Sequence, residues 1–219
     1  MRGWRALAIV PLAAMLLTGP ALALDDADVE VVASRHVVPP ADCMAEPRVF
    51  EDISTILALE GEGVRPPPAI QISPPLGAIA DEETTSEVRA VARRVIACFN
   101  AGDVPRATAL MTDAGVRRVY WGLTIDEENR ELSRTRLAGA PEPRADEALV
   151  SLIAVTDVLV LPNERVAAFV IIDEPLLQPE GAETLLFVFA NQDGMWRMDD
   201  LIDFTIAPIG GGVDAIPAP

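Results

Sequence analysis

The sequence predicts an α+β protein: a curved antiparallel sheet wrapped on helices that precede it, with an extended N-terminal arm. Two patterns carry this prediction. Between residues 84 and 136, apolar side chains recur at helical spacing, and after residue 148 β-branched and apolar runs alternate with turn residues. A helix with one apolar stripe needs a second layer that buries it, and the strands supply that layer.

The helical region is predicted to begin at Thr84, because Thr84 and Glu87 have the spacing of a capping box. The first helix ends at Asn100-Ala-Gly102, and Asp103 caps a second, shorter helix. Residues 126–136 form a third helix that is charged on most faces. The apolar stripe of the first helix consists of Val88, Val91, Val95, Ile96 and Phe99.

Four strands are predicted after residue 148, at residues 149–161, 165–173, 184–190 and 195–206. Pro162-Asn-Glu164 makes a turn between the first two strands. Asn191-Gln-Asp-Gly194 is a hairpin signal between the last two, because Asp-Gly adopts the backbone twist that a two-residue turn needs.

The predicted helices and strands form one domain, residues 84–207, and the residues before and after it carry weaker patterns. Residues 24–83 are predicted to form an arm with one short helix, within residues 47–59, where Pro47 suits a helix start. Residues 61–75 contain five prolines and form an extended linker. The tail, residues 208–219, is rich in Gly and Pro and is predicted to be disordered.

The first 23 residues have the three parts of an export signal. Arg2 and Arg5 supply the positive charge, residues 7–17 form an apolar run, and Ala21-Leu-Ala23 offers small residues for cleavage after Ala23. The run is shorter than the roughly 20 residues that span a membrane. We therefore expect a secreted, extracytoplasmic protein with no membrane attachment after cleavage; the alternative is an uncleaved membrane anchor.

The chain is strongly acidic, with a net charge of −17 and arginine as its only permanently charged basic residue. Such a surface repels phosphate backbones and anionic lipid. The charge therefore excludes nucleic acid and the membrane surface as expected partners.

The two cysteines, Cys43 and Cys98, are predicted to form a disulfide, since an even pair in an exported chain is most simply oxidised. The bond would attach the arm to the first helix of the domain. Two buried free thiols are the alternative.

Three short motifs resemble the SnoaL-like superfamily, which includes ketosteroid isomerase, scytalone dehydratase and nuclear transport factor two. They are Cys98-Phe-Asn-Ala-Gly-Asp103, Ala109-Leu-Met-Thr-Asp113 and Gly194-Met-Trp196-Arg-Met. The resemblance covers residues 84–207 and implies a cone-shaped fold, a cystatin-like roll, with a cavity at its mouth. The segment Asp42-Cys43-Met-Ala-Glu-Pro-Arg48 resembles secreted, uncharacterised members that pair a cysteine there with one in the first helix.

The catalytic residues that this resemblance implies are missing. Isomerases of the superfamily carry their catalytic carboxylate in a stretch that here reads Asp113-Ala-Gly-Val-Arg117-Arg118, so arginine stands in its place. Arginine does not give up its proton in proteins and cannot act as the base. The single histidine, His36, lies in the arm and is expected outside the fold.

Six residues are predicted to line the cavity: Phe99, Met111, Tyr120, Trp121, Asp157 and Phe187. The alternative for Tyr120 and Trp121 is that they pack where the strands meet the helices and bind no ligand. Trp196 is expected in the core. Asp199, Asp200 and Asp203 could ligate calcium but lack the spacing of a known loop, so solvated acids are favoured. No catalytic residue, metal site or cofactor is predicted.

We therefore expect a secreted, non-catalytic domain that binds a small apolar molecule in its cone or associates with a protein, including a homodimer through the sheet. The alternative is a lyase, isomerase or hydrolase for a small apolar substrate, with Asp157 or Tyr120 transferring the proton. A purely structural oligomerisation module is the third possibility.

Overall fold

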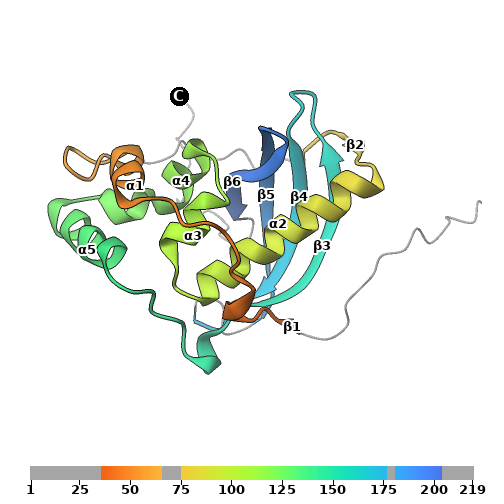
Figure 1. The fold of residues 1–219 in the computed structure, drawn as a ribbon. Coiled ribbons are helices and arrows are strands. Elements are labelled where there is room, and N and C mark those ends of the chain that lie inside the picture. Colours follow the sequence, from red (N-terminus) through yellow and green to blue (C-terminus); the bar gives the residue numbers. More distant parts are fainter. Residues whose placement is uncertain (1–35, 66–74, 177–180, 204–219) are drawn as a thin grey trace, which may run out of the picture.

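The computed structural model describes residues 36–65, 75–176 and 181–203. These residues form a mixed α+β fold in which helices pack on one face of a curled antiparallel sheet (Figure 1). The α+β prediction is confirmed at this level. The predicted signal peptide, most of the Pro-rich linker and the predicted tail lie outside the described residues.

Within the described residues, the sheet has six strands. Four follow one another as predicted: β3 (Ser151–Val160), β4 (Val166–Asp173), β5 (Glu183–Gln192) and β6 (Met195–Asp203). They pair antiparallel in the order β3-β4-β5-β6. The predicted hairpin joins β5 to β6, and Asp193 and Gly194 have φ angles of 54° and 79°, which are the positive values of a two-residue turn.

Two further strands were not predicted, and both come from the arm. β1 (His36–Val37) and β2 (Ala78–Ile79) each pair with β3, on the same edge. The expectation that His36 lies outside the fold was therefore wrong, because His36 pairs with Leu152 of β3. Strands of two residues carry no periodicity of their own and depend on the partner strand.

The long helix α2 (Glu82–Asn100) crosses the sheet diagonally (Figure 1). Its N-cap is Asp81, whose Oδ1 accepts a hydrogen bond from the Thr84 backbone N–H at 2.7 Å. The predicted capping box at Thr84 and Glu87 was therefore wrong by one turn. Asp81 takes the cap because its carboxylate satisfies a free amide and interacts favourably with the helix dipole.

The other helices lie beside α2. α3 (Val104–Ala109) is capped by Asp103 as predicted, and α5 (Glu127–Ala138) occupies the third predicted region. α1 (Phe50–Leu57) is the predicted helix of the arm. α4 (Asp113–Tyr120) was not predicted. Three short 3-10 helices span Pro40–Asp42, Trp121–Thr124 and Asp146–Ala148.

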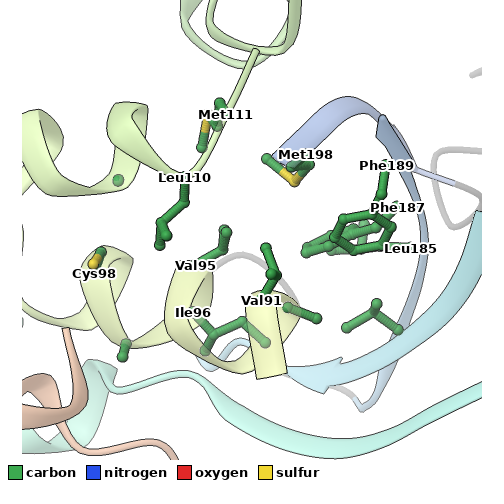
Figure 2. Close-up of a cluster of buried hydrophobic side chains, with 14 of the residues drawn as sticks. Val91, Val95, Ile96, Cys98, Leu110, Met111, Leu185, Phe187, Phe189 and Met198 are labelled. Carbon is green, nitrogen blue, oxygen red and sulfur yellow. The ribbon is translucent and has the colours of Figure 1, made fainter. Parts of the chain in front are cut away.

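The core forms where α2 packs on β5 and β6. Figure 2 shows Val91 and Val95 of α2 facing Phe187 and Phe189 of β5, with Met198 of β6 beside them. Each of these side chains is at most 4% exposed. Burial of these side chains is the main force that holds the helix on the sheet.

The disulfide between Cys43 and Cys98 is confirmed, with an S–S distance of 2.06 Å. It joins the arm to α2, and the arm is also held by hydrogen bonds. Arg48 donates to the Met111 carbonyl at 2.7 Å and to the Thr108 carbonyl at 3.2 Å. The described part of the arm is thus integrated with the domain.

Candidate functional site

The six residues predicted to line a cavity occupy different environments. Met111 and Phe187 are 0% and 1% exposed and belong to the core (Figure 2). Phe99 is half-buried against that core, whereas Asp157 is exposed on β3. None of the six lines the cleft between α2 and β3 or the two clefts beside the β5–β6 hairpin.

Tyr120 and Trp121 lie where α4 ends and a 3-10 helix begins, and both are half-buried. Burial, and then the nearby Asp103 carboxylate, raise the pKa of the Tyr120 phenol above its usual value. Tyr120 therefore keeps its proton at neutral pH. α4 packs on β6, whereas Asp157 lies on β3, which β4 and β5 separate from β6 in the sheet. The two proposed proton carriers thus lie on separate parts of the fold.

Two aspartates considered as calcium ligands bind arginine instead. Asp199 pairs with Arg165 at 2.9 Å and accepts a hydrogen bond from Thr112 at 2.6 Å. Asp200 pairs with Arg118 at 2.7 Å. Within the described ranges, no group of three or more His, Cys, Asp or Glu residues is arranged to hold a metal ion.

The α2–β3 cleft, with a volume of about 270 Å³, lies between helix and sheet edge. Its β3 wall consists of Leu152, Ile153, Ala154 and Val155, and its α2 wall of Arg89, Ala90 and Arg93, with His36 as a further lining residue. An apolar strand edge thus faces a helix that carries two arginines.

The middle of β3 has an open edge beside this cleft. β1 pairs with Ser151 and Leu152 at one end, and β2 pairs with Leu159 and Val160 at the other. Between them, no strand of the described residues pairs with residues 153–157 on this side. Figure 1 shows β1 and β2 at opposite ends of β3. An unpaired edge offers backbone N–H and C=O groups to another extended chain.

The arginines of the cleft differ in their partners. Arg93 donates to Asp42 at 2.9 Å, and its guanidinium lies 3.3 Å from the His36 ring. Arg89 is exposed and makes no ion pair with any described residue. The cleft therefore keeps positive charge in a chain whose net charge is −17.

Neither Arg89 nor Arg93 was predicted as a site residue, and the cleft was not predicted. The cleft depends on the gap between β1 and β2, which no sequence pattern marks. The one sequence signal that could have indicated the cleft was the apolar run of β3. A strand that is buried on one face alternates apolar and polar residues, and the run in β3 is longer than such alternation allows.

One described carboxyl group outside the cleft has a raised pKa. Glu183, at the start of β5, is 6% exposed. Burial, followed by the carboxylates of Asp203 and Glu174, raises the pKa of Glu183 to about 7. The folded protein thus holds a proton there that an unfolded chain releases above about pH 4.5.

The Glu183→Gln variant is expected to lose less stability than the wild type as the pH rises. Because the folded-state pKa is the higher one, the free energy of unfolding falls as pH rises from about 4.5 to about 7. Allowing for screening by solvent, this loss is roughly 1–2 kcal/mol. Urea unfolding of the wild type, Glu183→Gln and a control, Glu128→Gln on the exposed face of α5, measures it between pH 5 and 8. If the free energy of unfolding depended on pH equally in the wild type and in Glu183→Gln, the raised pKa would be contradicted.

Comparisons with protein-family models, curated proteins and solved structures found no match for this chain. Among the described helices, none is long and apolar enough to cross a membrane. The resemblance to the SnoaL-like superfamily therefore stays a prediction.

Proposed function

We propose that this protein is an exported, non-catalytic domain that binds an extended segment of another protein along the open edge of β3. The observation that carries the proposal is the gap between β1 and β2, which leaves residues 153–157 without a described partner strand on the side away from β4, beside the α2–β3 cleft. A segment that enters the gap would add a strand to the sheet, and its side chains would reach the cleft.

The size of the gap favours a single strand over a second copy of the domain. Five residues of β3 correspond to at most roughly 17 Å of extended chain, because the register with β4 shifts at both ends of this segment and Asp157 has a φ of 47°. β1 and β2 each stand one strand spacing, about 4.8 Å, beyond β3 at the ends of the gap. A second folded copy would contact them before its own strand reached hydrogen-bonding distance. The predicted homodimer through the sheet would need another surface.

Charge selects an acidic segment. Arg89 has no carboxylate partner among the described residues, and Arg93 pairs with a single carboxylate, that of Asp42. Charge complementarity across an interface raises the association rate and suppresses the wrong partners. A segment with apolar residues for the strand edge and a carboxylate toward α2 therefore fits best.

We also propose that the protein is exported and that its fold is a cone-shaped, SnoaL-like roll. The signal-like first 23 residues and the Cys43–Cys98 disulfide support an oxidising, extracytoplasmic location. The order of helices before a curled antiparallel sheet supports a cone-shaped, SnoaL-like roll. The side chains predicted inside its cone, Met111 and Phe187, are packed in the core, so we place binding at the edge rather than in the interior.

Fluorescence polarisation with a labelled nine-residue peptide tests this function. The peptide alternates Val and Thr at its centre and carries Glu at both ends, and a matched peptide carries Lys instead. We expect saturable binding of the Glu peptide, with binding of the Lys peptide at least tenfold weaker. Arg89→Gln should weaken binding of the Glu peptide roughly fivefold, about 1 kcal/mol, whereas Arg136→Gln on the exposed face of α5 should not.

The other candidate for this edge is the chain itself. Because β1 runs antiparallel to β3 with His36 opposite Leu152, a strand that extended β1 beyond His36 would enter the gap. The titration is therefore repeated on a chain that lacks residues 24–35. Binding seen only with the shortened chain would assign the edge to those residues and overturn the proposal of a partner protein, as would the absence of binding to both chains.

A further inference from the structure

Two further clefts lie on the neighbouring side of α2, toward the β5–β6 hairpin. Their volumes are about 260 and 680 Å³. They share five lining residues: Arg94, Ala109, Leu110, Met195 and Arg197. The two arginines are the only charged residues that line both clefts, and we call the shared region the Arg94–Arg197 site.

These two arginines lack the carboxylate partner that eight other described arginines have. Within the described residues, neither makes an ion pair with a carboxylate. The arginines that do so are Arg48, Arg93, Arg106, Arg118, Arg130, Arg134, Arg144 and Arg165.

Their hydrogen bonds leave the charge uncompensated. Arg197 donates from Nη1 to the Ala109 carbonyl at 2.8 Å, and its buried Nε has no hydrogen-bond partner. Arg94 donates from Nε to the Ala90 carbonyl of its own helix, at 3.4 Å. A buried guanidinium N–H without an acceptor, such as Arg197 Nε, is costly, and an anion bound beside the group would offset part of that cost through its charge.

Four acidic residues each line one of the two clefts, and none of them lines both. Glu87 accepts a hydrogen bond from the Trp196 indole at 3.1 Å. Asp113 pairs with Arg48 at 2.7 Å. Glu46 and Asp52 line only the larger cleft, and both are exposed. The shared region therefore keeps the positive charge of its two arginines.

We propose that Arg94 and Arg197 bind the oxyanion of a small organic acid, a carboxylate or a phosphate ester, whose apolar part lies against Leu110 and Met195. Guanidinium groups recognise both anions through charge-assisted hydrogen bonds. Met195 is 54% exposed, and an unbranched, flexible side chain adapts to an apolar ligand. The site is separate from the α2–β3 cleft and does not rest on the function proposed above.

Isothermal titration calorimetry of the mature protein at low ionic strength tests the site with three probes that share one ring. Benzoate and phenyl phosphate carry the two oxyanions, and benzamide is the neutral analogue of benzoate. We expect saturable binding of one or both anions with a stoichiometry of one, and at least tenfold weaker binding of benzamide. The relative affinities of the two anions identify the preferred oxyanion.

Two variants and one control assign the binding to the arginines. Arg94→Gln and Arg197→Gln are each expected to weaken anion binding about tenfold, which corresponds to about 1.4 kcal/mol. Arg94 bonds only to its own helix, so Arg94→Gln remains informative if Arg197→Gln fails to fold. Arg117→Gln, an exposed substitution on α4, should leave binding unchanged. The proposal is overturned if neither anion binds, if benzamide binds as tightly as benzoate, or if Arg94→Gln has no effect.

Discussion

Replacing both Cys43 and Cys98 with serine is expected to lower the free energy of unfolding by about 4 kcal/mol. The disulfide closes a loop of 55 residues, and opening that loop restores conformational freedom to the unfolded chain. A loss of this size is a large share of the 5–15 kcal/mol that typical domains have. Urea unfolding of the wild type and the double variant measures the difference.

Reduction provides the control for this prediction. A reductant should bring the wild type to the stability of the double variant and leave the double variant unchanged. The arm keeps its other contacts, including the Arg48 bonds to the Met111 and Thr108 carbonyls, so the variant is expected to fold. A loss below about 1 kcal/mol would show that the disulfide constrains the unfolded chain much less than its loop length implies.

Asn100→Ala is expected to lower the free energy of unfolding by about 3 kcal/mol or more. The Asn100 side chain is 0% exposed and lies at the end of α2. Its Nδ2 donates to the Val38 and Val150 carbonyls at 2.8 and 2.9 Å, and its Oδ1 accepts from the Val150 N–H at 2.9 Å. The variant leaves three buried backbone groups without partners, each at a cost of about 1–3 kcal/mol.

A second asparagine serves as the matched control. Asn129 lies on α5, and its side chain donates to Asp126 at 3.0 Å in an exposed hydrogen bond. Asn129→Ala should cost less than about 1 kcal/mol, because water replaces the lost partner. Thermal unfolding of both variants compares the two sites. Equal effects would mean that the Asn100 hydrogen bonds do not carry the connection between the arm and the sheet.

The helices and strands with strong local signals were readable from the sequence. Asp103 and Asp126 each precede a helix that they cap, and Asp193-Gly194 makes the turn between β5 and β6. α4 was missed because its eight residues include a glycine and two arginines, and because its cap, Thr112, acts through a bond to Gly115. The length of α4 is too short for a periodic signal to stand out.

The candidate sites were harder to predict because tertiary structure creates them. β1 and β2 have two residues each, so the open edge exists only because both pair with β3. Arg94 and Arg197 lie 103 positions apart and meet where the β5–β6 hairpin approaches α2. The predicted cavity residues Met111 and Phe187 have the apolar character of a ligand pocket, but that character is equally suited to the core.

Hydrogen–deuterium exchange on the protein without its predicted signal peptide tests the central claim, that the edge of β3 at residues 153–157 is open and accepts an extended acidic segment. The account predicts fast exchange of the outward-facing amides of residues 153–157 in the free protein, and at least tenfold slower exchange with the saturating Glu peptide. β4 lies inside the sheet and should exchange slowly in both states. Slow exchange at residues 153–157 in the free protein, or exchange that the peptide does not alter, would contradict the account.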